Sequence, residues 1–156
     1  MRRVVYYEAR ERDPQTQNQL TRAMLRDVRA RGALAAAAVG IDRERHIARA
    51  ARDARVIARE RSTWTVGHVE RLQAGLAVLR GDTEVAERSL RSAEAALDSS
   101  GLVLQAAVAR RQRGLLVGGD HGRQLVAEAV AFMRARAVVN VEAMSRMARH
   151  FPSIKG

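Results

Sequence analysis

The sequence predicts an all-α protein, a stack of antiparallel helix pairs (an α-solenoid) with about seven helices. Apolar residues recur at helical spacing along most of the chain, and the only two prolines, Pro14 and Pro152, lie near its ends. Glycine and aspartate interrupt this pattern at 40–42, 81–82 and 118–120, about 40 residues apart. Each glycine can end a helix in the left-handed conformation, and each aspartate can cap the helix that follows.

The first two helices are expected over residues 14–39 and 42–61. Asp13 is the N-cap of the first helix and Pro14 occupies its first position, where proline is favoured. Gly32 marks a bend or a close helix contact. The core positions expected in these two helices are Leu20, Met24, Leu25, Val28, Leu34 and Val39, then Ile47, Ala50, Ala51, Ala54, Ile57 and Ala58.

Five further helices are expected, with Asp82 and Asn140 as N-caps and Pro152 ending the last. They cover residues 64–80, 82–98, 102–117, 120–138 and 140–151. Their apolar stripes contain Val69, Leu72, Leu76 and Leu79; Val85, Ala86, Leu90, Ala93 and Leu97; Leu104, Ala107, Val108 and Leu115; Leu125, Ala129, Phe132 and Met133; and Val141, Met144, Met147 and Phe151. Trp64, Met133, Met144 and Met147 are expected to fill gaps between helices.

Composition indicates a single globular domain. Residues 1–13 form a basic lead, and residues 14–156 form one helical-repeat domain that is long enough to bury roughly 70% of its unfolded surface. The absence of cysteine excludes disulfides and thiolate metal sites. The longest apolar run, 33–39, is far shorter than the roughly 20 residues of a membrane span, so a cytoplasmic protein is expected.

The sequence predicts no catalytic, metal or cofactor site. The histidines are scattered one per helix or loop, without the spacing of metal ligands: His46, His68, His121 and His150. The segment 114–122 contains four glycines, but Arg123-Gln124 follows where a phosphate loop needs Lys-Ser or Lys-Thr. The end of one helix and the start of the next explain these glycines better.

Arginine dominates the charge. The net charge of +11 comes from 28 basic residues, all of them arginine except Lys155, against 17 acidic residues. GC-rich codon usage explains arginine in place of lysine, but it leaves the surplus over acids open. One face of the second helix carries Arg45, Arg49, Arg52, Arg55 and Arg59.

This row has two interpretations. After Glu44, only Asp53 and Glu60 are near enough in sequence to offset it. The row is either a solvated helix surface, partly paired with acids on the next helix, or a binding site for phosphate or an acidic peptide. The same alternatives apply to the cluster of Arg110, Arg111 and Arg113.

Two sets of residues resemble known families. Ala74, Ala77, Ala86, Leu90 and Ala93 follow the intervals of a tetratricopeptide repeat, although the Trp, Gly, Tyr and closing Pro of that signature are absent. The run Leu115-Leu116-Val117-Gly118-Gly119-Asp120-His121-Gly122, with Leu125, Ala129, Phe132-Met133, Met144 and Met147, resembles the C-terminal tail of large bacterial multidomain serine/threonine protein kinases.

The kinase-tail resemblance covers residues 20–151 and implies a long helical-repeat tail behind a kinase domain and an ATPase-like region. This chain differs from those tails at three positions: Phe132 replaces their Trp, Ala137 stands where Gly is usual, and Val141 stands after Asn140 where Pro is common. The glycine-rich loop, strand lysine, HRD and DFG motifs of a kinase are absent, so the chain is not a kinase by itself.

We therefore expect a non-catalytic helical-repeat module for protein–protein interaction, a regulatory or scaffolding segment that holds an acidic protein or peptide partner in a groove. The alternative is a basic nucleic-acid-binding protein that uses the Arg45–Arg59 face, although no aromatic side chains are interleaved there. A small enzyme with an unrecognised site is the third hypothesis. The last helix caps the stack, or its apolar face pairs two chains in a homodimer.

Overall fold

The computed structural model describes residues 14–60 and 62–147, and the regular structure within these ranges is entirely helical. In chain order the helices are α2 (Pro14–Ala38), α3 (Arg43–Ala58), α4 (Thr63–Arg80), α5 (Thr83–Ser99), α6 (Val103–Val117), α7 (Gly119–Ala135) and α8 (Val141–Met147). The all-α prediction and the seven expected helices are confirmed for this part of the chain. The basic lead, Asp13, His150, Phe151 and Pro152 lie outside it.

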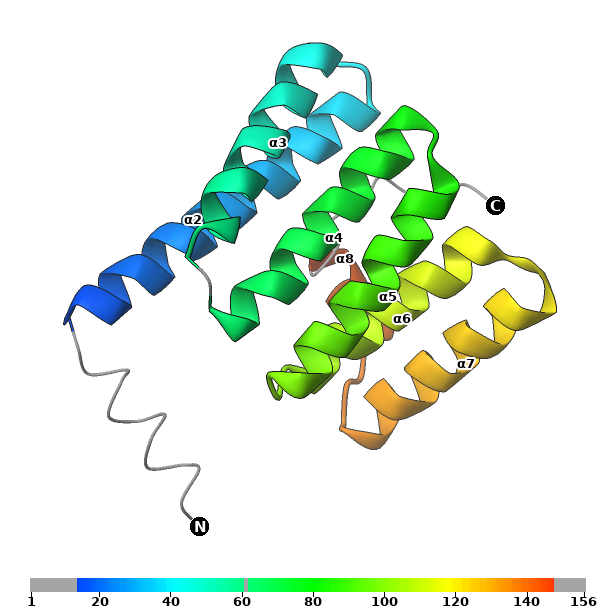
Figure 1. Cartoon of the computed structure of the whole chain (residues 1–156). Helices are drawn as coiled ribbons and strands as arrows, with labels where there is room; N and C mark the ends of the chain where they lie inside the picture. Colours follow the sequence, from blue (N-terminus) through cyan, green and yellow to red (C-terminus); the bar gives the residue numbers. More distant parts are fainter. Residues whose placement is uncertain (1–13, 61, 148–156) are drawn as a thin grey trace.

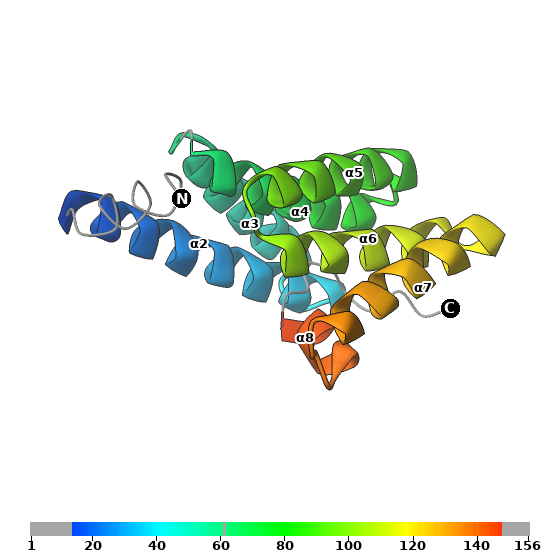
Figure 2. The same cartoon turned by 90° about the horizontal axis from the view of Figure 1, so that it is seen from below.

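Each helix packs against the next one along the chain, and α2 also contacts α4. Figure 1 shows α2 to α7 lying side by side in sequence order, joined by short turns. In the perpendicular view, the short α8 lies on the side of α6 and α7 that faces away from α5 (Figure 2). None of the described helices is long and apolar enough to cross a membrane.

The predicted glycine breaks all end helices, but only one of their aspartates caps the next helix. Gly40, Gly81 and Gly118 have φ angles of 83°, 79° and 66°. Asp82 accepts a hydrogen bond from the backbone N–H of Val85 at 3.0 Å, as predicted. Asn140 likewise caps α8, accepting from the N–H of Ala143 at 2.8 Å.

At the other two breaks the capping prediction is wrong. Asp42 precedes α3, but its backbone is left-handed (φ 37°), and its side chain makes no capping hydrogen bond. Asp120 lies inside the first turn of α7, because that helix already begins at Gly119, and its carboxylate pairs with Arg123. An acid in the first turn still favours the helix through the dipole.

Small apolar clusters between neighbouring helices make up the core. The largest joins α2, α3 and α4 around Leu34, Ile57 and Leu72, and further clusters join α4 to α5, α5 to α6, and α6 to α7 and α8. Met133 is completely buried in the cluster between α6, α7 and α8, and Met144 packs against this cluster. Stability is therefore expected to be a sum of neighbour interfaces.

The predicted stripe of α2 is largely wrong. Met24, Leu25, Val28 and Val39 are between 56% and 73% exposed. The residues that α2 buries are mainly alanines, namely Ala23, Ala30, Ala33 and Ala37, with Leu34. Since α2 is the first described helix and its main contacts are with α3 and α4, no described helix packs closely on its outer side. Ala58 of α3 and Leu115 of α6 are also exposed rather than buried.

Two glycines allow α6 and α7 to approach closely. A Cβ on Gly114 would lie 2.6 Å from the carbonyl oxygen of Gly122, and a Cβ on Gly122 would collide with the carbonyl oxygen of Gly114. Both glycines are buried. Gly32 differs: a Cβ there would meet nothing within 4 Å, and α2 continues through it, so the predicted close contact is absent.

The surroundings of Gly122 and Gly32 predict opposite effects of a glycine-to-alanine substitution on stability. Gly122→Ala should destabilise the protein by about 1–3 kcal/mol, because a methyl group is forced against a backbone carbonyl. Gly32→Ala should stabilise it by about 0.5–1 kcal/mol through the lower entropy of the unfolded chain. Urea denaturation followed by circular dichroism measures both, and equal effects would contradict the close approach of α6 and α7.

Candidate arginine surface

The arginine row of α3 lies on the helix side opposite its buried residues. Ile47, Ala50, Ala54 and Ile57 face the core. All five arginines of the predicted row are exposed on the other side: Arg45, Arg49, Arg52, Arg55 and Arg59. The helical spacing thus placed the row correctly.

Few of these arginines have an acidic partner among the described residues. Arg45 lies 4.0 Å from Asp42, with both side chains exposed. Arg55 donates from Nε to the carbonyl oxygen of Ala51 at 3.3 Å, and it lies in the last turn of α3, where a cation is favoured by the helix dipole. Arg49 and Arg52 lie in the middle of the helix and have neither an acidic nor a backbone-carbonyl partner among the described residues.

Asp53 does not offset the row, contrary to the prediction from its position in the sequence. It is 1% exposed and turns towards α2. There Arg29 Nε donates to Oδ2 at 2.8 Å, its Nη2 pairs with Oδ1, and Arg26 Nη1 lies 3.6 Å from the same Oδ1. Glu60, the other acid expected to offset the row, is exposed beyond the end of α3.

The pairing with Asp53 extends the basic surface onto α2, which sequence reasoning missed. Arg22, Arg26 and Arg29 lie at i, i+4 and i+7, so they share one face of α2. Arg26 and Arg29 reach across to α3. We call the whole set the arginine face, and it comprises Arg22, Arg26, Arg29, Arg45, Arg49, Arg52, Arg55 and Arg59. Their spacing was a readable signal, but the apolar stripe assigned to α2 obscured it.

Cations outnumber acids on the arginine face. The hydrogen bond and charge of Asp53 raise the pKa of Arg29 above its ordinary value, so this side chain stays charged at any physiological pH. Exposed charges within a Debye length of about 8 Å at physiological salt reinforce one another. A surface of this kind attracts anions and can hold carboxylate or phosphate oxygens with bidentate geometry.

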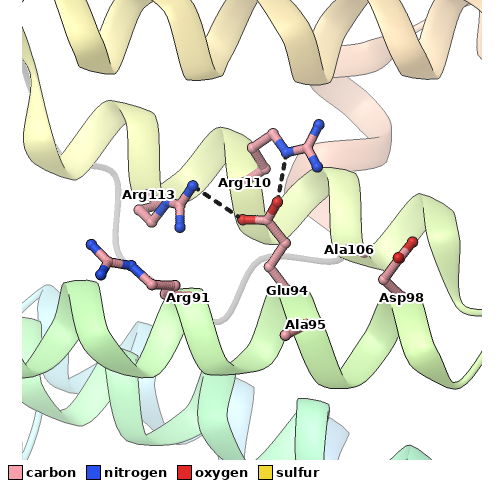
Figure 3. Close-up of a pocket in the computed structure, with 7 residues that line it drawn as sticks. All are labelled: Arg91, Glu94, Ala95, Asp98, Ala106, Arg110 and Arg113. Carbon is pink, nitrogen blue, oxygen red and sulfur yellow. Dashed lines mark hydrogen bonds and ion pairs between the residues drawn. The ribbon is translucent and has the colours of Figure 1, made fainter.

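The second predicted cluster, on α6, is paired with acids of neighbouring helices. Arg110 Nε donates to Glu94 Oε1 at 2.6 Å, and Arg113 Nη2 lies 3.4 Å from Glu94 Oε2. Arg111 donates to Glu142 of α8 at 2.7 Å. These arginines connect α6 to α5 and α8, so the structural interpretation applies to them. Figure 3 shows the hollow that Arg110 and Arg113 line together with α5.

A cluster of buried and partly buried polar side chains lies between α2 and α4. Arg31 Nε forms an ion pair with Asp27 Oδ2 at 3.1 Å, and His68 Nδ1 is 3.8 Å from the same oxygen. Arg71 is 1% exposed, and its Nε and Nη2 have no hydrogen-bond partner. Burial lowers the pKa of Arg71 to about 10, although Asp27 opposes the shift and Arg31 adds to it.

The remaining motifs of the sequence do not come together. His46, His68 and His121 belong to α3, α4 and α7, and within the described residues no group of three His, Cys, Asp or Glu residues is placed to hold a metal ion. His68 instead packs edge-on against Trp64, with ring centroids 5.8 Å apart. The glycine-rich segment 114–122 is the end of α6 and the start of α7, as predicted.

Comparisons with protein-family models, with curated proteins and with solved structures found no significant match.

Asp53 should be important for stability. Asp53→Ala removes charge-assisted hydrogen bonds between α2 and α3 and is expected to cost roughly 1.5–3 kcal/mol. Asp98→Ala changes an exposed side chain that makes no hydrogen bond or ion pair in the described chain, so it should change stability by less than about 0.5 kcal/mol. Thermal and urea unfolding of both variants measure the difference, and similar small effects would show that Asp53 is dispensable.

Arg71→Met should stabilise the protein at pH 8 by roughly 1–4 kcal/mol, because it replaces a buried cation whose Nε and Nη2 have no hydrogen-bond partner among the described residues. The folded protein releases the Arg71 proton before the unfolded chain does. Wild-type stability relative to the variant should therefore increase as pH rises above about 10. Urea unfolding of both proteins at pH 8 and pH 11 tests this. A destabilised variant at pH 8 would mean that attraction to Asp27 exceeds the cost of burial.

Proposed function

We propose that this chain is a non-catalytic helical module for protein–protein interaction and that its arginine face binds an acidic segment of a partner protein. One observation carries the proposal. Arg22, Arg49 and Arg52 are exposed within their helices and have no acidic partner in the described chain. Asp53 of α3 cannot supply one, because it is buried and already paired with Arg29 and Arg26. An acidic partner would supply the missing counter-charges.

A protein partner suits this surface better than a nucleic acid. Single-stranded nucleic acids usually stack on aromatic side chains, and the arginine face contains none. It does present an apolar side chain, because Leu25 is 65% exposed and lies between Arg22 and Arg29 along α2. Apolar side chains beside arginines fit an amphipathic acidic helix or strand.

We further propose that the helices form a tetratricopeptide-like solenoid, related to the helical tails of bacterial serine/threonine kinases. Two observations support this proposal. Contacts run from each helix to the next, with an additional contact from α2 to α4. The residues of α4 and α5 at the family's intervals are all buried: Ala74, Ala77, Ala86, Leu90 and Ala93. In such a segment the module would regulate or scaffold by holding its partner.

The double variant Arg49→Ala plus Arg52→Ala tests the binding function. Fluorescence anisotropy would use two labelled probes of equal charge, an amphipathic Glu/Leu peptide and a single-stranded oligonucleotide. Loss of two exposed ion pairs between these arginines and carboxylates of the peptide should weaken peptide binding by roughly five- to thirtyfold. The matched control, Arg88→Ala plus Arg134→Ala, removes the same charge from α5 and α7 and should change the Kd less than about twofold.

The probes distinguish the alternatives. Tighter binding to the oligonucleotide, with a salt slope that falls by about two in the α3 variant, would favour the nucleic-acid function instead. Equal weakening by both variant pairs would show that only net charge matters, and the proposed docking face would then be wrong.

A further inference from the structure

The outer side of α2, the first of the helices that lie side by side in Figure 1, carries an uncharged apolar surface. Met24, Leu25 and Val28 are 56%, 65% and 56% exposed. At helical spacing they share one side with the exposed Gly32 and Ala35, opposite the alanines that α2 buries. We call these five residues the outer α2 surface. It extends about 17 Å along the helix axis, since each helical residue rises about 1.5 Å.

Positive charge is concentrated along one edge of the outer α2 surface. Arg22, Arg26 and Arg29 follow the edge that faces α3, where two of them pair with one buried carboxylate. Three cations therefore stand against a single acid. On the opposite edge, Arg31 lies 3.1 Å from Asp27, so that edge brings no comparable surplus. The outer α2 surface thus borders the arginine face on one side only.

Gly32 makes this surface shallow at its C-terminal half. A Cβ at Gly32 would meet nothing within 4 Å, and the φ of this residue is not positive, so the described chain does not require glycine here. A glycine within a helix destabilises it relative to alanine. With Ala35 one turn further, it leaves little side-chain volume, and a packed helix could bring a bulky side chain close to the α2 backbone.

We propose that the outer α2 surface docks an acidic amphipathic helix of the partner protein, with its apolar side on this surface and its carboxylates on Arg22, Arg26 and Arg29. This inference rests on the proposed function and specifies its partner. A helix of about twelve residues, or three turns, spans the surface. It fits better than an extended segment, which gains main-chain hydrogen bonds at a sheet edge, because the described chain contains no strand.

Charge disfavours a second copy of this chain as the occupant. Two copies would bring two net charges of +11 together, along with two sets of the same three arginines. Like charges repel, whereas an acidic helix offsets the surplus at the edge of the surface.

Two labelled peptides of identical composition separate apolar docking from charge attraction. In the first, leucines share one face of a glutamate-rich helix; in the second, the same residues are scrambled so that the leucines share no face. Fluorescence anisotropy should show at least about tenfold tighter binding of the first peptide. Leu25→Gln plus Val28→Gln should reduce this preference to within about twofold, because only charge attraction remains. Glutamine has good helix propensity, so this outer-surface variant should fold.

A matched control and an arginine variant identify which proposal fails. Leu115→Gln plus Val117→Gln changes two exposed apolar residues of α6 and should leave the preference unchanged. Arg49→Ala plus Arg52→Ala should weaken both peptides and keep their ratio. A preference retained in the outer-surface variant would overturn the docking of an amphipathic helix. Unchanged binding of both peptides in the arginine variant would instead contradict the proposed function.

Two further measurements on the full chain test the occupant. The outer-surface variant should keep the urea midpoint of the wild type, and both proteins should sediment as monomers. A lower midpoint would show that the chain itself covers the surface, and a wild-type dimer that dissociates in the variant would show that a second copy does. Either result would overturn the proposal.

Discussion

The buried carboxylate of Asp53 is the interaction on which the arrangement of α2 and α3 depends. An ionised side chain with 1% exposure is tolerated only when its oxygens are paired. Arg29 engages both oxygens of Asp53, and Arg26 approaches one of them from the next turn. The pairing fixes the register of α2 against α3 and places two basic helix faces side by side. It also removes from the surface an acid that lies within the arginine row in the sequence.

Close packing of small residues is the second constraint on the fold. Alanines at the buried positions of α2 and α3, and the facing glycines of α6 and α7, let neighbouring helices approach with little side-chain volume between them. Such a core has no central cluster that all helices share. Each interface depends on its own few residues, and exposed side chains on the outer faces are free to carry function.

Most of the fold was predictable from the sequence because its signals are local. Helix positions follow from apolar spacing and from glycines that end helices, and the predicted boundaries lie close to those of α4, α5 and α6. The failures concern packing partners. Leu25 and Val28 have helical spacing, but none of the described helices covers them. Asp53 looks like an exposed counter-charge until α2 is placed beside it. Arg71 gave no signal, since nothing in its sequence surroundings indicates burial.

The distribution of arginines bears on the two explanations for their surplus. Codon usage alone would leave exposed, unpaired arginines anywhere that structure tolerates them. In the described chain outside the arginine face, Arg80, Arg134 and Arg146 lie in the last turns of α4, α7 and α8, where the helix dipole favours a cation. Arg43 bonds to backbone carbonyls, and Arg136 stacks on Phe132 at 3.5 Å. Arg22 of α2 and Arg49 and Arg52 of α3 are exposed and have no such structural use within residues 14–60 and 62–147. Codon usage accounts for the choice of arginine over lysine, whereas this local concentration of unpaired charge favours an anionic partner.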